Sequence, residues 1–142
     1  IFLDYPSYEQ EITIVKNTTA DEVQKVGHVL SAEEIVAYQH LVRRVPVADN
    51  VVEYAVKLTH LTRPNQNGSS VANEYLEWGA GPRASQYLML GAKCNALLNG
   101  KYSPDIEDVR AVAKPVLRHR IVRNFKAEAE GVSVDGIIEK LM

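Results

Sequence analysis

The sequence predicts an all-α fold, a helical bundle preceded by a short N-terminal remnant strand. Three observations carry this prediction. Apolar residues recur at helical spacing in several separate segments. Serine, proline and glycine stand where helices begin and end. The 142 residues are 46% hydrophobic and 24% charged, with few prolines and glycines, which is typical of one ordered domain of useful size.

The first six residues differ from the rest of the chain. Ile1, Phe2 and Leu3 form an apolar run that Pro6 ends, which is the pattern of a strand. A lone strand has no sheet to join. We therefore expect that the chain was cut from a longer protein whose missing part holds the sheet, with residues 1–6 as the remnant strand and residues 7–142 as the helical domain.

Two capping-box patterns predict the first two helices. Ser7 with Gln10 begins a helix that runs to about Lys16. Ser31 with Glu34 begins a second helix that ends near residue 44. The stretch between them, residues 17 to 30, has a mixed pattern, and we expect it to be irregular with at most one helical turn.

Two longer helices follow. Residues 48 to 62 place apolar side chains largely on one face and charged ones on another, which predicts a helix. A polar loop, residues 63 to 70, and a brief element, residues 71 to 78, come next. Proline is favoured at the first helical position and Asn-Gly after the last, so Pro82 and Asn99-Gly100 predict a helix over residues 82 to 98.

The remaining third of the chain predicts two more helices. Ser103 and Pro104 supply an N-cap and a first helical residue for a helix towards Lys114, which Pro115 ends or restarts. A basic connector follows, and Ser133 caps a final helix. About six helices in total indicate a bundle.

The most informative stretch is Gly-Ala-Gly-Pro-Arg-Ala at residues 79 to 84. Pro82 sets Arg83 second in its helix, where a cation works against the helix dipole at a cost of about 0.3–1 kcal/mol. An arriving phosphate would reverse that cost, because exposed backbone N–H groups at a helix start favour an anion. Gly81, Pro82 and Arg83 are therefore candidate phosphate-binding residues. The alternative is a solvated arginine at an ordinary helix start.

A second candidate is the basic segment, residues 114 to 126. Arg118, His119 and Arg120 at its centre are candidates for a contact with a neighbouring subunit. Solvation alone and nucleic-acid binding are the alternatives. We expect no nucleic-acid partner, because the net charge of −2 supplies no overall attraction to phosphate backbones.

Other classes of function find little support. The single cysteine, Cys94, excludes a disulfide framework and a cysteine-based metal site, and favours a reducing, cytoplasmic setting. The histidines have no metal-ligand spacing, so no metal site is expected. No apolar run reaches the roughly 20 residues that span a bilayer. The chain also lacks a phosphate loop and a nucleophile elbow.

Several separated stretches together resemble the C-terminal part of MoxR-type AAA+ ATPases. They occur in the family's order, with similar spacings, over nearly the whole chain. The stretches are residues 3–6 (Leu-Asp-Tyr-Pro), 45–47 (Val-Pro-Val), 78–85 (Trp-Gly-Ala-Gly-Pro-Arg-Ala-Ser), 115–121 (Pro-Val-Leu-Arg-His-Arg-Ile) and 130–132 (Glu-Gly-Val).

The resemblance implies a role for each part. Residues 1–6 would be the last strand of the AAA+ core, and residues 7–142 its helical lid. Arg83 would be the sensor-two arginine, a catalytic residue that reaches the γ-phosphate of ATP. The motifs that hold ATP and magnesium in this family would precede Ile1, so the chain alone should bind no cofactor and hydrolyse no ATP.

The resemblance also implies partners. The parent would be a homo-oligomeric ring that hydrolyses ATP and acts, like a chaperone, in the maturation of other proteins. A protein with a von Willebrand factor A-type domain is the partner that the family suggests. The alternatives to this interpretation are a helical DNA-binding module and a self-sufficient protein-interaction module.

Overall fold

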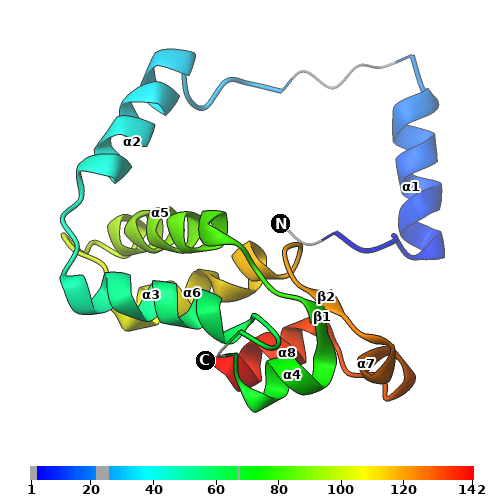
Figure 1. Cartoon of the computed structure of the whole chain (residues 1–142). Coiled ribbons are helices and arrows are strands. Elements are labelled where there is room, and N and C mark those ends of the chain that lie inside the picture. The colour runs from blue at the N-terminus through cyan, green and yellow to red at the C-terminus, as the bar shows by residue number, and fades with distance from the viewer. Residues whose placement is uncertain (1–2, 22–25, 67) are drawn as a thin grey trace. The chain divides into compact units, whose positions relative to one another are not determined.

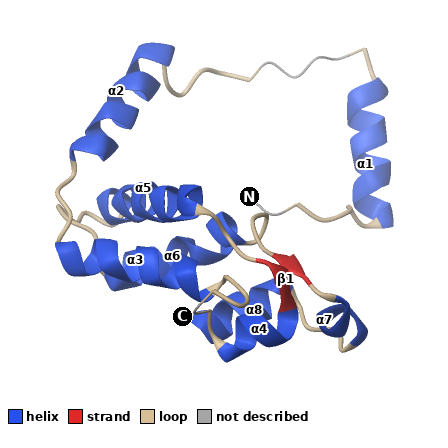
Figure 2. Cartoon of the chain, in the orientation of Figure 1, coloured by secondary structure: helices blue, strands red, loops and turns tan. Residues whose placement is uncertain are grey.

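The computed structural model describes residues 3–21, 26–66 and 68–142. The all-α fold class is confirmed: the described residues form eight helices and only two short strands (Figure 1, Figure 2). Contacts divide the chain into two compact units, Ile1–Ala37 and Tyr38–Met142. The candidate residues of both predicted sites lie in the second unit.

The first unit contains helix α1 (Tyr8–Thr19), and helix α2 (Ala32–Arg44) crosses the division. Both predicted capping boxes form. The Gln10 N–H donates to Ser7 Oγ at 3.3 Å and the Ser7 N–H to Gln10 Oε1 at 2.9 Å. The same two bonds join Ser31 and Glu34 at 3.1 and 2.7 Å. The expected helix starts are confirmed, and α1 continues three residues beyond the predicted end.

The predicted remnant strand is not a strand over its described part. Residues 3 to 7 adopt neither helix nor strand, and Ile1 and Phe2 lie outside the described residues, as do four residues of the segment expected to be irregular. A strand requires a neighbour for its backbone hydrogen bonds, and these residues pair with none in the described chain. The assignment of residues 1–6 to a core sheet stays a prediction.

In the second unit, helices α3 (Asp49–Leu61), α5 (Pro82–Leu98) and α6 (Ile106–Leu117) pack against one another (Figure 1). Along α5 the buried residues recur every four positions: Ala84, Leu88, Ala92 and Ala96. The close approach of α6 is seen at Gly91, where an added Cβ would lie 3.1 Å from a methyl group of Val112. Ala84, Leu88 and Ala92 of this stripe belong to the hydrophobic core.

The rest of the second unit consists of short elements. Helices α4 (Ser70–Tyr75), α7 (Phe125–Ala129) and α8 (Val134–Leu141) pack near an antiparallel ribbon of β1 (Leu76–Trp78) and β2 (Val122–Arg123) (Figure 2). The brief element expected at residues 71 to 78 is therefore one helix and one strand. The basic segment also holds strand β2 and the start of helix α7, which the sequence pattern did not predict.

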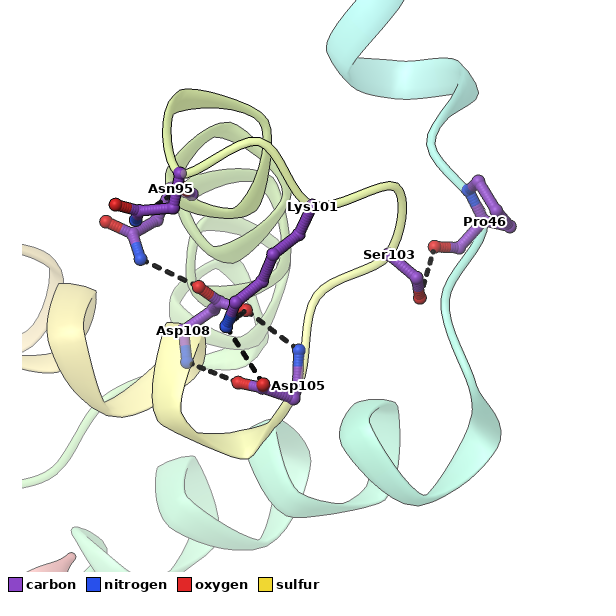
Figure 3. A network of polar contacts seen from close by, with 7 residues as sticks. Pro46, Asn95, Lys101, Ser103, Asp105 and Asp108 are labelled. Atoms are coloured by element: carbon purple, nitrogen blue, oxygen red, sulfur yellow. Dashed lines mark hydrogen bonds and ion pairs between the residues drawn. The ribbon is translucent and has the colours of Figure 1, made fainter.

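A buried carboxylate joins the end of α5 to the start of α6. Asp108 is 2% exposed and accepts hydrogen bonds from Asn95 Nδ2 at 2.8 Å and Lys101 Nζ at 3.1 Å (Figure 3). Asp105 and Asp108 form a capping box with each other. The prediction that Ser103 and Pro104 begin α6 is therefore wrong. Asp105 is the N-cap, and the Ser103 hydroxyl instead donates to the Pro46 carbonyl at 3.1 Å.

The predicted break at Pro115 is also wrong. Helix α6 runs through Pro115 and ends at Leu117, which is fully buried. A proline inside a helix removes one backbone hydrogen bond. Here the loss falls in the last turn, and burial of the apolar residues on either side, Ala113 and Leu117, holds the helix together.

Candidate functional site

Arg83 lies where the sequence predicts it, second in helix α5. Gly81 is the N-cap, with φ −84° and ψ 179°, and Pro82 is the first helical residue. The Arg83 side chain is exposed. Within the described part of the chain it forms no hydrogen bond and no ion pair. Its guanidinium is therefore available to a ligand or a partner.

The electrostatics of this helix start favour an anion. Gly81 has no side chain to cap the first N–H groups, and the first turn of α5 holds no acidic residue. The positive end of the helix dipole and the charge of Arg83 thus coincide without compensation. An anionic group that approached would meet backbone N–H groups and a guanidinium together.

The turn that leads into α5 is held by the end of α3. The Ala80 N–H donates to Thr62 Oγ1 at 2.9 Å, and the Ala80 carbonyl accepts a hydrogen bond from Arg63 Nε at 2.9 Å. The Thr62 hydroxyl in turn donates to the Thr59 carbonyl at 2.6 Å. Thr62 and Ala80 are 0% and 1% exposed, so the hydrogen bond between them is shielded from water.

Two glycines allow this close approach. A Cβ added at Gly79 would lie 2.4 Å from the Thr62 carbonyl oxygen, and one at Gly68 would lie 1.9 Å from the Arg63 carbonyl oxygen. Both distances are too short for any side chain. Gly81, by contrast, has open space where its Cβ would be. The backbone of residues 62 and 63 is therefore enclosed by glycines on two sides.

A cleft of about 600 Å³ adjoins the turn, lined by residues 63 to 66 and 77 to 81. Trp78 lies on its wall and is 67% exposed. The sequence analysis did not predict this cleft or the hydrogen bond of Arg63 to Ala80, because it placed Arg63 only in a polar loop. Its residues come from two segments that fold together, and no local spacing links them.

The three predicted subunit-contact residues have different surroundings. Arg118 donates from Nε and Nη2 to the two carboxylate oxygens of Asp135, at 2.7 and 2.6 Å. This hydrogen bonding lowers the pKa of the Asp135 carboxyl below its usual value. His119 is exposed. Arg120 donates from Nη1 to the Val116 carbonyl at 2.8 Å.

Arg120 also lies near the candidate phosphate site. Its guanidinium carbon stands 5.1 Å from the centre of the Tyr87 ring. Tyr87 follows Arg83 by four residues in α5, so the two share one face of the helix. The structure thus brings Arg120 to the helix that carries Arg83. A contact of residues 118 to 120 with another subunit stays a prediction.

The two lysines of the basic segment form ion pairs within the second unit. Lys114 forms an ion pair with Glu139, and Lys126 forms one with Glu74. These pairs cancel part of the segment's positive charge. In the described ranges, no histidine, cysteine and carboxylate side chains gather in a group that could hold a metal ion. Nor do those ranges include a helix with the length and hydropathy to cross a membrane.

Comparisons with known proteins show which family and which solved fold the chain matches. A family model described as the AAA lid domain matches residues 68–141, more than half of the chain. The chain is 30% identical, over 143 aligned positions, to the "Chaperone MoxR1" of Mycobacterium tuberculosis, covering all of this chain and 38% of that protein. It is 25% identical to the "Uncharacterized protein YeaC" of Bacillus subtilis, covering 99% of this chain and 42% of that one.

A solved structure is similar over the same range. The crystal structure of a protein from Cytophaga hutchinsonii, described as a "putative ATPase", matches with a TM-score of 0.79 and 29% identity. The match covers 99% of this chain and 43% of that one. The chain therefore spans about two fifths of the length of the proteins it matches.

Proposed function

This chain belongs to the AAA lid domain family, as its resemblance to MoxR-type AAA+ ATPases predicted, and we propose that it is the nucleotide-sensing lid of such an ATPase. In this proposal Arg83 is the sensor-two arginine, and Gly81 and Pro82 present it to the γ-phosphate of ATP. The observation that carries the proposal is an exposed cation, without a partner in the described chain, at the positive end of helix α5.

The proposed mechanism is an electrostatic latch. ATP bound to the core carries negative charge on its γ-phosphate, which a guanidinium can pair with by charge-assisted hydrogen bonds. Hydrolysis and phosphate release remove that charge. The lid's preferred position on the core then changes with the nucleotide, and the change is passed to the neighbouring subunits of a homo-oligomeric ring.

The latch is too weak to bind ATP by itself. A charge-assisted hydrogen bond contributes about 1.5–3 kcal/mol. Association costs about 4–15 kcal/mol in lost translational and rotational freedom. The core of the same protein must therefore hold the nucleotide and its magnesium ion. We expect calorimetry on this chain to detect no ATP binding, and a micromolar dissociation constant would contradict the proposal.

We also propose partners for the intact ATPase. The relative named a chaperone supports a role in the maturation of other proteins. A von Willebrand factor A-type protein is the partner that we propose outside the ring, and residues 118 to 120 are the proposed contact inside it. We place the whole assembly in the cytoplasm. Co-purification with the intact protein, with and without substitutions at Arg118 and Arg120, tests these contacts.

The deciding experiment measures ATP turnover by the intact ATPase that carries this lid. Arg83→Ala should lower kcat about tenfold or more, since a charge-assisted hydrogen bond is lost. Gln86→Ala, an exposed substitution one turn along the same helix, is the matched control and should change nothing. Equal turnover by the Arg83→Ala protein and the wild type would remove Arg83 from the mechanism.

A further inference from the structure

We propose that Thr62 and Arg63 are positioning residues for Arg83: by binding both polar groups of Ala80, they set the direction of the first turn of α5. This inference rests on the proposed function, since it concerns how the sensing arginine is aimed. It assigns a role to the end of α3, whose residues come about twenty positions before Arg83 in the chain.

The geometry of Ala80 carries the proposal. Its N–H and its carbonyl group are both engaged, the first by Thr62 Oγ1 and the second by Arg63 Nε, each at 2.9 Å. Bonds on both sides of one residue fix its position and its orientation together. Gly79 adds a steric limit, because its α-carbon lies against the Thr62–Arg63 peptide, where a Cβ would be 2.6 Å from Arg63 Cα.

Little freedom remains between Ala80 and Arg83. Only Gly81 and Pro82 intervene, and the proline ring fixes φ of Pro82. Gly81 is itself held at one point, because its carbonyl accepts a hydrogen bond from the Ala84 N–H at 2.9 Å. The orientation of Ala80 therefore contributes directly to where α5 starts and where Arg83 points. A rotation at Ala80 would move the guanidinium directly.

Arg63 is suited to a fixed role. It follows α3 by two residues, close to the negative end of that helix, where a cation is favoured. A second nitrogen of its guanidinium, Nη1, lies 3.3 Å from His60 Nε2, so it is held at two points. Arg83 has the opposite environment, at a positive helix end and with no partner in the described residues. Arg63 therefore holds the turn in place, and Arg83 remains available to bind a phosphate.

Trp78 provides a reporter in this chain. It is the single tryptophan, lies two residues before Ala80, and shares the cleft wall with Arg63. Arg63→Met and Thr62→Val should alter its emission maximum or its quenching by acrylamide. Arg110→Met is the matched control, because Arg110 also donates to a backbone carbonyl, that of Met142, but outside the cleft. Unchanged fluorescence in both test variants would overturn the proposal.

The second test measures ATP turnover by the intact protein. Arg63→Met should lower kcat/KM for ATP about tenfold or more, as misplacement by about 1 Å can do, while the affinity for ADP stays near the wild-type value. In an Arg83→Ala background the same substitution should cause no further loss. Arg63→Lys and Thr62→Ser, which keep a donor and a hydroxyl, should restore part of the rate.

The outcomes separate this proposal from the proposed function. If Arg83→Ala leaves turnover unchanged, the sensing role itself fails, and the positioning role fails with it. If Arg83→Ala slows turnover but Arg63→Met does not, only the positioning role is wrong. Losses that multiply in the double variant indicate a general effect on the fold, and they too would overturn the positioning role. Thermal unfolding of the Arg63→Met and Arg110→Met proteins checks that both are folded.

Discussion

Two helix ends in this molecule carry arginines in opposite situations. At the start of α5, Arg83 stands at the positive end of the helix dipole, exposed, with no partner in the described chain. At the end of α6, Arg118 stands at the negative end of the dipole and binds both carboxylate oxygens of Asp135. Thus Arg118 is paired with a carboxylate, whereas Arg83 has no partner among the described residues.

The difference indicates what each arginine does. A cation at a C-terminal helix end is stabilised by the dipole, and a bidentate carboxylate adds to this. Such a residue contributes to the fold. A cation at an N-terminal end is placed unfavourably unless an anion arrives from outside. We therefore assign nucleotide sensing to Arg83, and to Arg118 a structural role in addition to the subunit contact proposed above. The predictions below test that division, starting with the largest effect.

The largest effect should come from breaking the turn that carries Arg83. Gly79→Ala would place a Cβ 2.4 Å from the Thr62 carbonyl oxygen, so the end of α3 and the turn must separate. Overpacking of this kind costs about 1–3 kcal/mol in free energy of unfolding. Gly81→Ala, which meets open space, is the control. Urea unfolding of both variants measures the difference, and equal stabilities would contradict the close packing.

A smaller loss of stability is expected when the ion pair at the end of α6 is removed. Asp135→Asn removes the charged acceptor of Arg118, and the melting temperature should fall by less than in Gly79→Ala, because the pair is partly exposed to solvent. Glu128→Gln offers a comparison, since Glu128 is exposed and forms no ion pair in the described residues. A melting temperature unaffected by Asp135→Asn would show that Arg118 is not committed to the fold.

Acid should remove the contribution that the Arg118–Asp135 pair makes to the stability of the fold. Hydrogen bonding from Arg118 lowers the pKa of Asp135 below its ordinary value of 3.8. A carboxyl with a lowered pKa in the folded state stabilises the fold fully above that ordinary value. The contribution disappears as the pH falls through the lowered pKa. Urea midpoints measured from pH 5 to pH 2 should fall, and fall less steeply in Asp135→Asn.

The smallest effect concerns Arg83 in this chain alone. Removing a cation from a helix N-terminus should leave stability unchanged or raise it by about 0.3–1 kcal/mol. Thermal unfolding of Arg83→Ala at low ionic strength measures this. A clear loss of stability would mean that Arg83 has a structural partner, and the contrast with Arg118 would fail.

Local signals in the sequence predicted the helix that carries the site. Pro82 at the start and Asn99-Gly100 at the end define α5 with the observed bounds, and Gly100 has the positive φ of 72° that such a terminus favours. The start of α6 was misplaced, because Ser103-Pro104 and Asp105 are both plausible caps. The capping box of Asp105 with Asp108 and the tertiary contact of Ser103 with the Pro46 carbonyl decide between them.

Features that depend on distant contacts were not predictable from the sequence. The β1–β2 ribbon pairs residues more than forty positions apart, and each strand is too short to show a period. The hydrogen bonds that join Ala80 to Thr62 and to Arg63 span 18 and 17 residues. The exposure of Arg83 could be predicted because it follows from the helix start alone. The hydrogen bonds that hold the turn before Arg83 form only when distant parts of the chain meet in the fold.

The most direct test of the sensing role compares the affinities of two nucleotides for the intact protein. Only ATP carries the γ-phosphate that Arg83 is proposed to bind. Arg83→Ala should therefore weaken ATP binding about tenfold or more while leaving ADP binding at the wild-type value. A variant that loses affinity for both nucleotides equally, or for neither, would contradict the account.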